Sequence, residues 1–387
     1  MRIDAHIHFT PPQLRQRLDK LSEEEPYWGL LLNPPNSKSI QGWADPERMI
    51  ADMDAAGIDK VVIVGEYFRQ HEACVARNNQ AIELVERYPE RVLALATLQP
   101  AAGELAIDEL KRCLDAGLHG VGELNPYAQG VDLLDRRFLR LVDAIVEADV
   151  PLNLHVSEEV GGYYLGKSTT PLRDYYSLAC RYPELKLILA HWGGGLFLYE
   201  IMPRVRKQLS RVWYDTAASP LLYPTKKIFT TALTCISHQK ILYGSDYPLL
   251  IYPSKMAEPD MRPFLTAIDK LALDPEVYTD VMGLNAARLF QQDGFGPADL
   301  PLVGSGSDAA AAIERPITGR MAVSMVVAEF PETQKLFSEY NIPVDDQPVP
   351  DWEPIIQAAT RQGHGPEKQR DLLQRINEVI QERVSID

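Results

Sequence analysis

Short apolar segments alternate with segments of helical periodicity over about the first 290 residues, and this alternation limits the folds open to the chain. Eight apolar segments occur: Arg2–Phe9, Lys60–Glu66, Arg91–Leu98, Gly120–Asn125, Pro151–Val156, Lys186–His191, Val212–Thr216 and Lys240–Ser245. Several are continuously apolar, such as KVVIVG and LKLILA. Continuous runs are typical of parallel strands that are buried on both faces. The alternation therefore predicts an α/β fold with a parallel sheet.

The intervening segments have clear helix boundaries. Helices are expected over Asp45–Ala56, Glu72–Arg87, Glu104–Ala116 and Arg136–Ala148. The first begins with Asp-Pro and stops at Gly57, and such residues are common at the two ends of a helix. Eight strand–helix units match a (β/α)8 TIM barrel. A doubly wound open sheet is the alternative, but it is disfavoured because polar candidate residues follow many different strands.

Two long segments follow predicted strands and are expected to line a pocket. The segment Thr10–Ala44 follows the first strand and contains Trp28, and Glu158–Thr170 follows the fifth and contains Tyr163. Loops of this length usually serve as lids or binding loops. Trp28 and Tyr163, together with Trp192 next to the sixth strand, are therefore the expected substrate contacts.

The character of the sequence changes after the last barrel unit. We expect the barrel to occupy residues 1–296 and a linker, which contains VGSGSDAAAA, to occupy residues 297–314. Residues 315–387 are predicted to form a small helical domain. Its helical patterns are Val323–Phe330, Glu332–Tyr340 and Pro366–Val384.

The composition excludes several classes of partner. The formal net charge is -15 and charged residues make up 24% of the chain, whereas nucleic acids and anionic membranes attract basic surfaces. We therefore expect a small-molecule substrate, no nucleic acid and no membrane. No basic and apolar leader is evident, and the 4 cysteines form no CxxC pair. The sequence is typical of a cytoplasmic protein with free thiols.

A pair of histidines at the end of the first strand is the first sign of a metal site. His6 and His8 are two residues apart, and strand residues at this spacing face the same side. The pair alone is a weak signal, because two surface histidines can occur by chance. However, His155, His191 and Asp246 each come directly after a later apolar run. In a barrel all these strand ends meet at one face.

The residue types suit catalysis by a metal ion. Imidazole and carboxylate groups bind zinc and similar divalent ions, and a catalytic site can activate a water molecule. Asp246 is placed to accept the proton from that water, and His191 to polarise the substrate or carry a proton. Glu123 ends the fourth strand and would either join the metal site or form a salt bridge.

Six ordered motifs resemble those of the amidohydrolase superfamily. They are DAHIHF, GELNP, LNLHVSE, LILAHWGGG, LYGSDYP and GLNAARLF, within residues 1–290. The resemblance is greatest to the amidohydrolase-related branch that includes aminocarboxymuconate-semialdehyde decarboxylase. It implies that His6, His8, His155 and Asp246 bind a divalent metal, that His191 is catalytic, and that the protein is a homodimer. In TatD-like hydrolases a Gly-Glu pair resembling Gly122-Glu123 supplies a ligand shared by two metals, so one or two ions, most readily zinc, are expected.

The C-terminal segment carries a second resemblance. The sequence from Pro316, PITGRMAVSMVVAEFPETQKLFSEYNIPV, is similar to the small helical domain DUF1858. Many members of that family carry cysteines after the corresponding turn, whereas this chain reads NIPVDDQPVP. A redox or metal role is therefore not expected, and the segment is interpreted as a helical cap or interaction module.

Three functions are compatible with these features. We favour a metal-dependent hydrolase that attacks a small-molecule substrate with a metal-activated water, because Glu123 suits a metal-rich hydrolytic site. The alternative is a nonoxidative decarboxylase or hydratase of an unsaturated or aromatic carboxylic acid, whose carboxylate Arg69 or Arg173 would bind. A third hypothesis, a catalytically inactive binding scaffold, is disfavoured because every candidate site residue retains metal-binding chemistry.

Overall fold

The computed structural model describes residues 1–35, 38–292, 294–296, 317–319, 321–344 and 353–384. The chain divides into two compact units, one formed by Met1–Asp132 and Arg140–Gly304 and the other by Leu133–Leu139 and Ser305–Asp387. The predicted linker at 297–314 lies outside the described residues. The boundaries that the sequence suggests at residues 296 and 315 therefore stay predictions.

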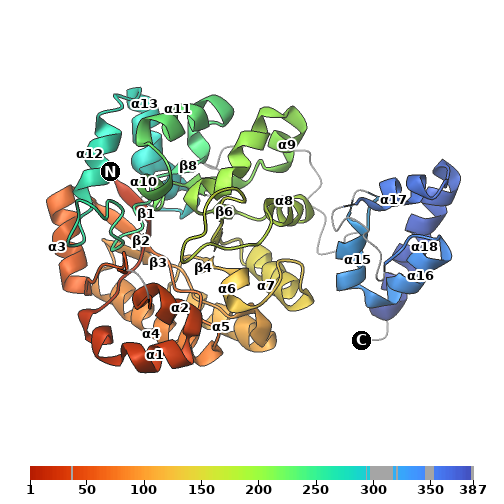
Figure 1. Ribbon diagram of the computed structural model, residues 1–387, viewed down its shortest axis with the longest axis horizontal. Helices are drawn as coiled ribbons and strands as arrows, with labels where there is room; N and C mark the ends of the chain where they lie inside the picture. Colours follow the sequence, from red (N-terminus) through yellow and green to blue (C-terminus); the bar gives the residue numbers. More distant parts are fainter. Residues whose placement is uncertain (36–37, 293, 297–316, 320, 345–352, 385–387) are drawn as a thin grey trace. The chain divides into compact units, whose positions relative to one another are not determined.

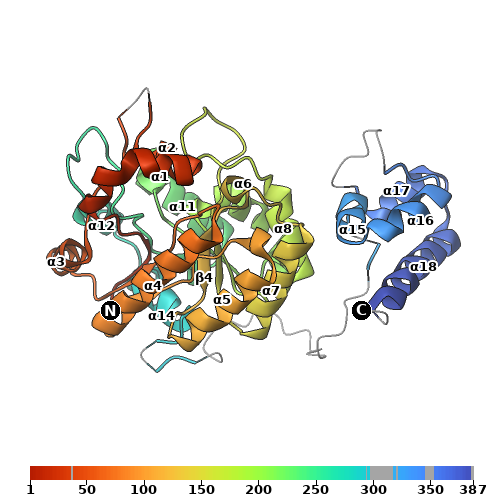
Figure 2. The same cartoon turned by 90° about the horizontal axis from the view of Figure 1, so that it is seen from below.

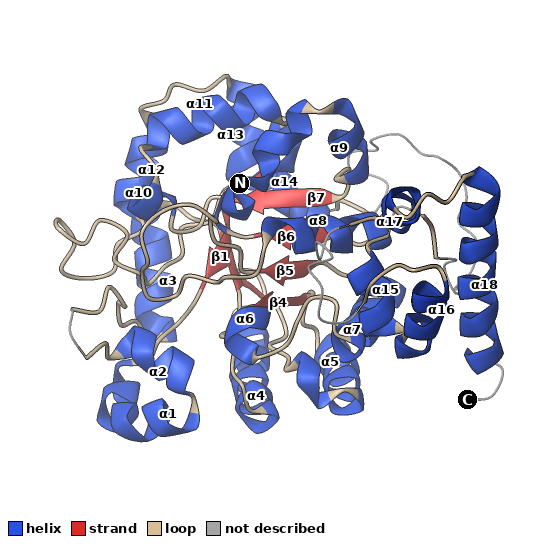
Figure 3. Ribbon diagram, turned by 45° about the vertical axis from the view of Figure 1, so that its right-hand side comes forward, coloured by secondary structure: helices blue, strands red, loops and turns tan. Residues whose placement is uncertain are grey.

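The larger unit contains a parallel strand within each of the eight predicted segments. The strands are β1 (Ile3–Ile7), β2 (Lys60–Ile63), β3 (Val92–Ala94), β4 (Val121–Leu124), β5 (Leu152–Leu154), β6 (Leu187–Leu189), β7 (Val212–Asp215) and β8 (Ile241–Leu242). They pair in the orders β1-β2-β3 and β4-β5-β6-β7-β8. Parallel bridges between Ala96 and Val121 and between Ile7 and Tyr247 join the two sheets at both seams. The predicted (β/α)8 barrel is confirmed, with helices around the strands (Figure 1, Figure 3).

Helices connect consecutive strands, and three more follow β8 in the described part of the larger unit. Their bounds are α1 (Leu18–Glu24), α2 (Pro26–Leu32), α3 (Pro46–Ala56), α4 (His71–Arg87), α5 (Glu104–Asp115), α6 (Pro126–Gln129), α7 (Arg136–Glu147), α8 (Leu172–Arg181), α9 (Pro203–Gln208), α10 (Ser219–Leu222), α11 (Thr225–Cys235), α12 (Arg262–Asp269), α13 (Pro275–Thr279) and α14 (Asn285–Leu289). Helix α3 shows why the residues at its two ends predicted its bounds. The Asp45 side chain accepts a hydrogen bond from the Arg48 backbone N–H at 2.8 Å, and Gly57 ends the helix with φ 67°.

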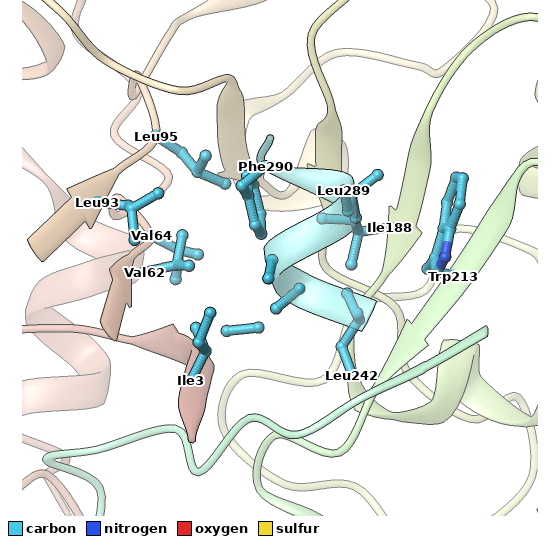
Figure 4. Close-up of a cluster of buried hydrophobic side chains, with 13 residues drawn as sticks. Ile3, Val62, Val64, Leu93, Leu95, Ile188, Trp213, Leu242, Leu289 and Phe290 are labelled. Carbon is cyan, nitrogen blue, oxygen red and sulfur yellow. The ribbon is translucent and has the colours of Figure 1, made fainter. Parts of the chain in front are cut away.

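A hydrophobic cluster fills one end of the barrel. It combines side chains from six strands or their continuations with the last helix, α14 (Figure 4). Its members include Ile3, Val62, Val64, Leu93, Leu95, Ile188, Trp213, Leu242, Leu289 and Phe290. Burial of each large apolar side chain contributes about 1.5–3 kcal/mol. The polar residues that follow the strands lie at the opposite end of the barrel.

The smaller unit is helical, as predicted. It comprises α15 (Val323–Glu329), α16 (Gln334–Glu339), α17 (Ile355–Arg361) and α18 (Pro366–Val384). A core of its own includes Val323, Phe337, Ile355, Leu372 and Ile376. Within the residues that the structure describes, none of the helices combines the length and the apolar character needed to cross a membrane.

Candidate metal centre and active site

Six predicted site residues come together where the barrel strands end. They are His6 in β1, His8 just after it, Glu123 in β4, His155 after β5, His191 after β6 and Asp246 after β8. All six side chains are mostly buried, and those of His6 and Glu123 are 0% and 2% exposed. Because the carboxyl ends of parallel barrel strands meet at one face, side chains far apart in sequence converge there.

The first group of potential ligands consists of His6, His8 and Asp246. The two imidazole rings are edge to face with centroids 5.3 Å apart. His8 Nε2 lies 3.5 Å from Asp246 Oδ1. The Asp246 backbone N–H donates to the His6 carbonyl at 2.9 Å, so the segment after β8 is fixed directly to β1.

The second group consists of Glu123, His155 and His191. Glu123 Oε1 lies 2.9 Å from His155 Nδ1 and 3.3 Å from His191 Nε2. The other nitrogen of His155, Nε2, lies 3.1 Å from the carbonyl of Gly166 in the loop after β5. The two groups adjoin, because His6 Nε2 is 3.8 Å from Glu123 Oε2.

The residues present fit a divalent cation. His6 Nε2 is buried and has no hydrogen-bond partner among the described residues. A buried polar atom without a partner is unfavourable, and a bound cation satisfies a neutral imidazole nitrogen. Neutral imidazole and carboxylate groups are the donors that zinc and related metals accept in catalytic sites. The donor set therefore suits a metal without distinguishing one ion from two.

The charges in the cluster are strongly coupled. Burial opposes ionisation of these groups, but carboxylates around His6, chiefly Asp215 and Glu123, raise its pKa to about 10. For His191, burial is outweighed by Glu123, which raises the pKa to about 9. Burial of Asp246 is likewise outweighed by His8 and the other histidines, which lower the Asp246 pKa below its ordinary value. A cation that binds here must displace the imidazolium protons.

Asp215 is a site residue that the sequence analysis missed. It ends β7, is fully buried, and its Oδ2 lies 2.9 Å from His6 Nδ1. The signal was available, because Asp215 ends an apolar run just as Asp246 follows one. Its neighbour at the same strand ends, Asn153 in β5, contacts it at 3.4 Å.

The glycine run after His191 serves packing within the chain. Residues 191–195 all have positive φ, between 56° and 95°. A Cβ on Gly194 would lie 2.4 Å from the Ser157 carbonyl, and one on Gly193 would lie 2.8 Å from the Tyr214 ring. Glycine alone adopts this conformation at no steric cost. The turn sets the direction in which His191 enters the site.

Tyrosine rings continue from the metal-binding cluster towards the cap formed by α1 and α2. The Tyr67 ring is 5.6 Å from that of His155, Tyr27 of α2 is 5.8 Å from Tyr67, and Tyr127 of α6 is 6.2 Å from Tyr27. Figure 2 shows α2 and α6 at the same end of the barrel. We call Tyr27, Tyr67 and Tyr127 the tyrosine wall. Their contacts join three separate segments, so the sequence alone did not indicate them.

The predicted substrate contacts occupy different environments. Trp28 is 8% exposed and packs edge-on against Phe68 at 5.1 Å, inside the cap. Trp192 is fully buried and its indole N–H donates to Ser219 Oγ at 2.9 Å. Tyr163 is 80% exposed on the loop after β5. The structure thus gives the two tryptophans packing positions and leaves Tyr163 exposed, and the role of Tyr163 in substrate binding stays a prediction.

The two arginines considered as carboxylate ligands lie outside the metal-binding cluster. Arg69 and Arg173 are both exposed. The Arg69 backbone N–H donates to Glu25 at 2.7 Å, and Arg173 Nε lies 3.7 Å from Asp174. We therefore assign neither guanidinium to a substrate.

Comparisons with known proteins agree with this architecture. A family model described as amidohydrolase matches residues 3–292. The fold is similar to that of 5-carboxyvanillate decarboxylase from Novosphingobium aromaticivorans, solved with bound manganese, with 18% identity and a TM-score of 0.60 over 75% of this chain and 97% of that one. It is also similar to dihydroxybenzoic acid decarboxylase from Polaromonas sp. JS666, solved with manganese and 2-nitroresorcinol (18% identity, TM-score 0.57, 75% and 96% covered). A third similar structure is 2,6-dihydroxybenzoate decarboxylase from Rhizobium (18% identity, TM-score 0.54, 75% and 98% covered).

Proposed function

Because the chain belongs to the amidohydrolase family, which its residues 3–292 match, we propose that it is a metal-dependent, nonoxidative decarboxylase of a small aromatic carboxylic acid. The observation that carries this proposal is the tyrosine wall beside a buried cluster of imidazoles and carboxylates. Aromatic rings stack favourably on one another in offset or edge-on geometry, so the wall suits a planar ring. Similarly folded proteins named as aromatic-acid decarboxylases support the same substrate class.

The metal ligands we propose are His6, His8, His155 and Asp246, with Glu123 as a further carboxylate. Manganese is as suitable as the zinc that the sequence suggested, since manganese is bound in two of the similarly folded decarboxylases. A divalent cation held there would supply the positive charge that attracts the carboxylate or hydroxyl oxygens of the substrate. This assignment also explains why an arginine is not required at the site.

We assign proton transfer to two residues of the site, His191 and Asp246. In the reaction the bond between the ring carbon and the carboxyl group breaks, CO2 leaves, and the electron pair left on the ring carbon takes up a proton. Burial works against a charged His191, but Glu123 raises the His191 pKa to about 9. Asp246 is ionised at neutral pH, because the histidines beside it lower its pKa. We assign donation of this proton to His191. Asp246 accepts the proton that the carboxyl group of the substrate gives up before CO2 leaves, and passing that proton on to His191 restores both residues.

Hydrolysis, which the sequence analysis favoured, is the second candidate. The observation in its favour is the ionised Asp246, 3.5 Å from His8, which suits a base for an attacking water. The family name alone does not separate the two reactions. The tyrosine wall and the names of the similar structures lead us to place decarboxylation first.

Product analysis separates the two reactions. The protein loaded with Mn²⁺ is incubated with hydroxybenzoic acids, and CO2 and the phenol are quantified. A parallel set of aryl esters, amides and lactones tests hydrolysis. We expect CO2 and phenol in equal amounts from at least one acid, and loss of both in a Glu123→Gln variant. Hydrolysis of a carboxylic ester or amide without CO2 release from any acid would contradict the proposal.

A further inference from the structure

Asp215 contacts two parts of the site at once. Its side chain is fully buried at the end of β7, between β6 and β8. Oδ2 lies 2.9 Å from His6 Nδ1. Oδ1 accepts hydrogen bonds from the backbone N–H groups of His191 at 2.9 Å and Ala217 at 3.1 Å. One carboxylate therefore holds the ring of a proposed ligand and the start of the turn that carries His191.

The contact with His6 decides which ring nitrogen carries hydrogen. A carboxylate only accepts hydrogen bonds, so His6 Nδ1 must be the protonated nitrogen in the neutral ring. Nε2 is then left with its lone pair, and it is the atom that lies 3.8 Å from Glu123 and has no hydrogen-bond partner among the described residues. A partner on the far nitrogen of a metal-binding histidine fixes the tautomer and strengthens the ligand.

We infer that Asp215 is a positioning residue that keeps Nδ1 of His6 protonated, so that Nε2 binds the metal. The inference rests on the metal site of the proposed function but not on the reaction catalysed there. It also explains why a carboxylate occupies a fully buried position in β7, where an apolar side chain would otherwise be favoured.

An amide at this position can keep the two backbone contacts while it changes the contact with His6, although the 3.4 Å contact from Asn153 Nδ2 to Oδ2 is lost as well. In an Asp215→Asn variant, the amide oxygen can still accept from the backbone N–H groups of His191 and Ala217. The amide NH2 then faces His6 Nδ1 and donates to it, which places the ring hydrogen on Nε2, the atom needed by the metal. We expect the barrel to stay folded. A metal on Nε2 would then force the ring hydrogen onto Nδ1, where it faces the amide NH2 instead of a carboxylate oxygen.

The first experiment measures Mn²⁺ affinity by competition with a chelator, together with thermal unfolding of the metal-free protein. For Asp215→Asn we expect an unfolding midpoint close to the wild-type value and an Mn²⁺ Kd about 10- to 100-fold higher. The matched control is Asp4→Asn, which changes another fully buried aspartate of the barrel. Asp4 accepts from the backbone N–H groups of Ser245 at 2.9 Å and His6 at 3.3 Å, so the control leaves the ring nitrogens of His6 unaltered.

Two outcomes of this experiment would overturn the inference. One is an unchanged Mn²⁺ Kd in folded Asp215→Asn. The other is an equal loss of affinity in both variants, which would show a general effect of changing a buried aspartate of the barrel. Neither result depends on CO2 release, so a failed decarboxylation assay and a failed positioning role remain distinguishable.

A second measurement does not use the Asp215→Asn variant, and it decides the matter if that variant does not fold. Long-range proton–nitrogen NMR on Zn²⁺-loaded protein labelled with ¹⁵N-histidine reports which nitrogen of each of the 8 histidines carries hydrogen. A His6→Gln spectrum identifies the His6 signals. We expect hydrogen on Nδ1 and the metal on Nε2. The reverse arrangement, or two protonated nitrogens in the loaded protein, overturns the inference.

Discussion

Replacement of Arg77 by methionine tests a buried ion pair next to the metal-binding strand. Arg77 of α4 pairs with Glu66, which follows β2, and the two side chains are only 7% and 5% exposed. Its guanidinium also donates to the Phe9 carbonyl at 2.8 Å and stacks on the Phe9 ring at 3.6 Å. Because Phe9 directly follows His8, this contact anchors the end of the segment that carries the histidine pair.

The expected loss of folding stability in Arg77→Met follows from the groups that lose their partners. Methionine approximates the volume of the arginine stem, so the main loss is the charge partner of Glu66 and the donor to Phe9. Removal of one member of a buried ion pair is destabilising by about 3–5 kcal/mol, because the other charge stays buried without compensation. At about 2 °C per kcal/mol for a domain of this size, the unfolding midpoint should fall by about 6–10 °C.

Urea denaturation followed by circular dichroism and thermal scans measure the effect. The double variant Glu66→Gln/Arg77→Met also removes the unpaired buried charge of Glu66, so it should recover part of the lost stability. The matched control on the same helix is Arg87→Met, since Arg87 and its partner Glu47 are 50% and 58% exposed. That variant should stay close to the wild type, because exposed pairs contribute little. If Arg77→Met is no less stable than Arg87→Met, the reasoning from burial is refuted.

Three further predictions concern the metal, the proton acceptor and acid stability. The double variant His6→Ala/His8→Ala should lose bound metal by elemental analysis and keep the wild-type circular dichroism spectrum, whereas full metal content would show that the ligand set is wrong. Asp246→Asn should fold normally and lose most turnover in the CO2 assay, because its amide cannot accept the proton, and normal turnover would rule out that role. Burial lowers the pKa of His119 below its ordinary value of about 6.5, so the unfolded chain binds more protons than the folded one below that pH. The free energy of unfolding should therefore fall between pH 7 and pH 5 more steeply for the wild type than for His119→Gln, and equal slopes in urea titrations would contradict this assignment.

The repeating pattern of apolar segments explains how much of the site could be predicted. The polar residues at strand ends, from His6 to Asp246, were found because strand order and strand direction place them at one face of a barrel. Asp215 gives the same signal, but its contacts are with His6 Nδ1 and the backbone N–H of His191, and only the packed strands bring these groups together. The predicted α/β barrel, the strand segments and the helix ends were confirmed for the same reason: they depend on local periodicity and capping.

By itself the sequence determined the elements, the end of the barrel that carries the chemistry and the types of donor gathered there. Only the tertiary structure decided which nitrogen of His6 faces Glu123, that Trp28 and Trp192 are buried, and that three tyrosines from separate segments form a wall beside His155. The physical reason is the range of the interactions. Strand and helix formation follows from neighbours in the chain, whereas a tautomer, a ring contact or the exposed fraction of a tryptophan depends on side chains that only packing brings together.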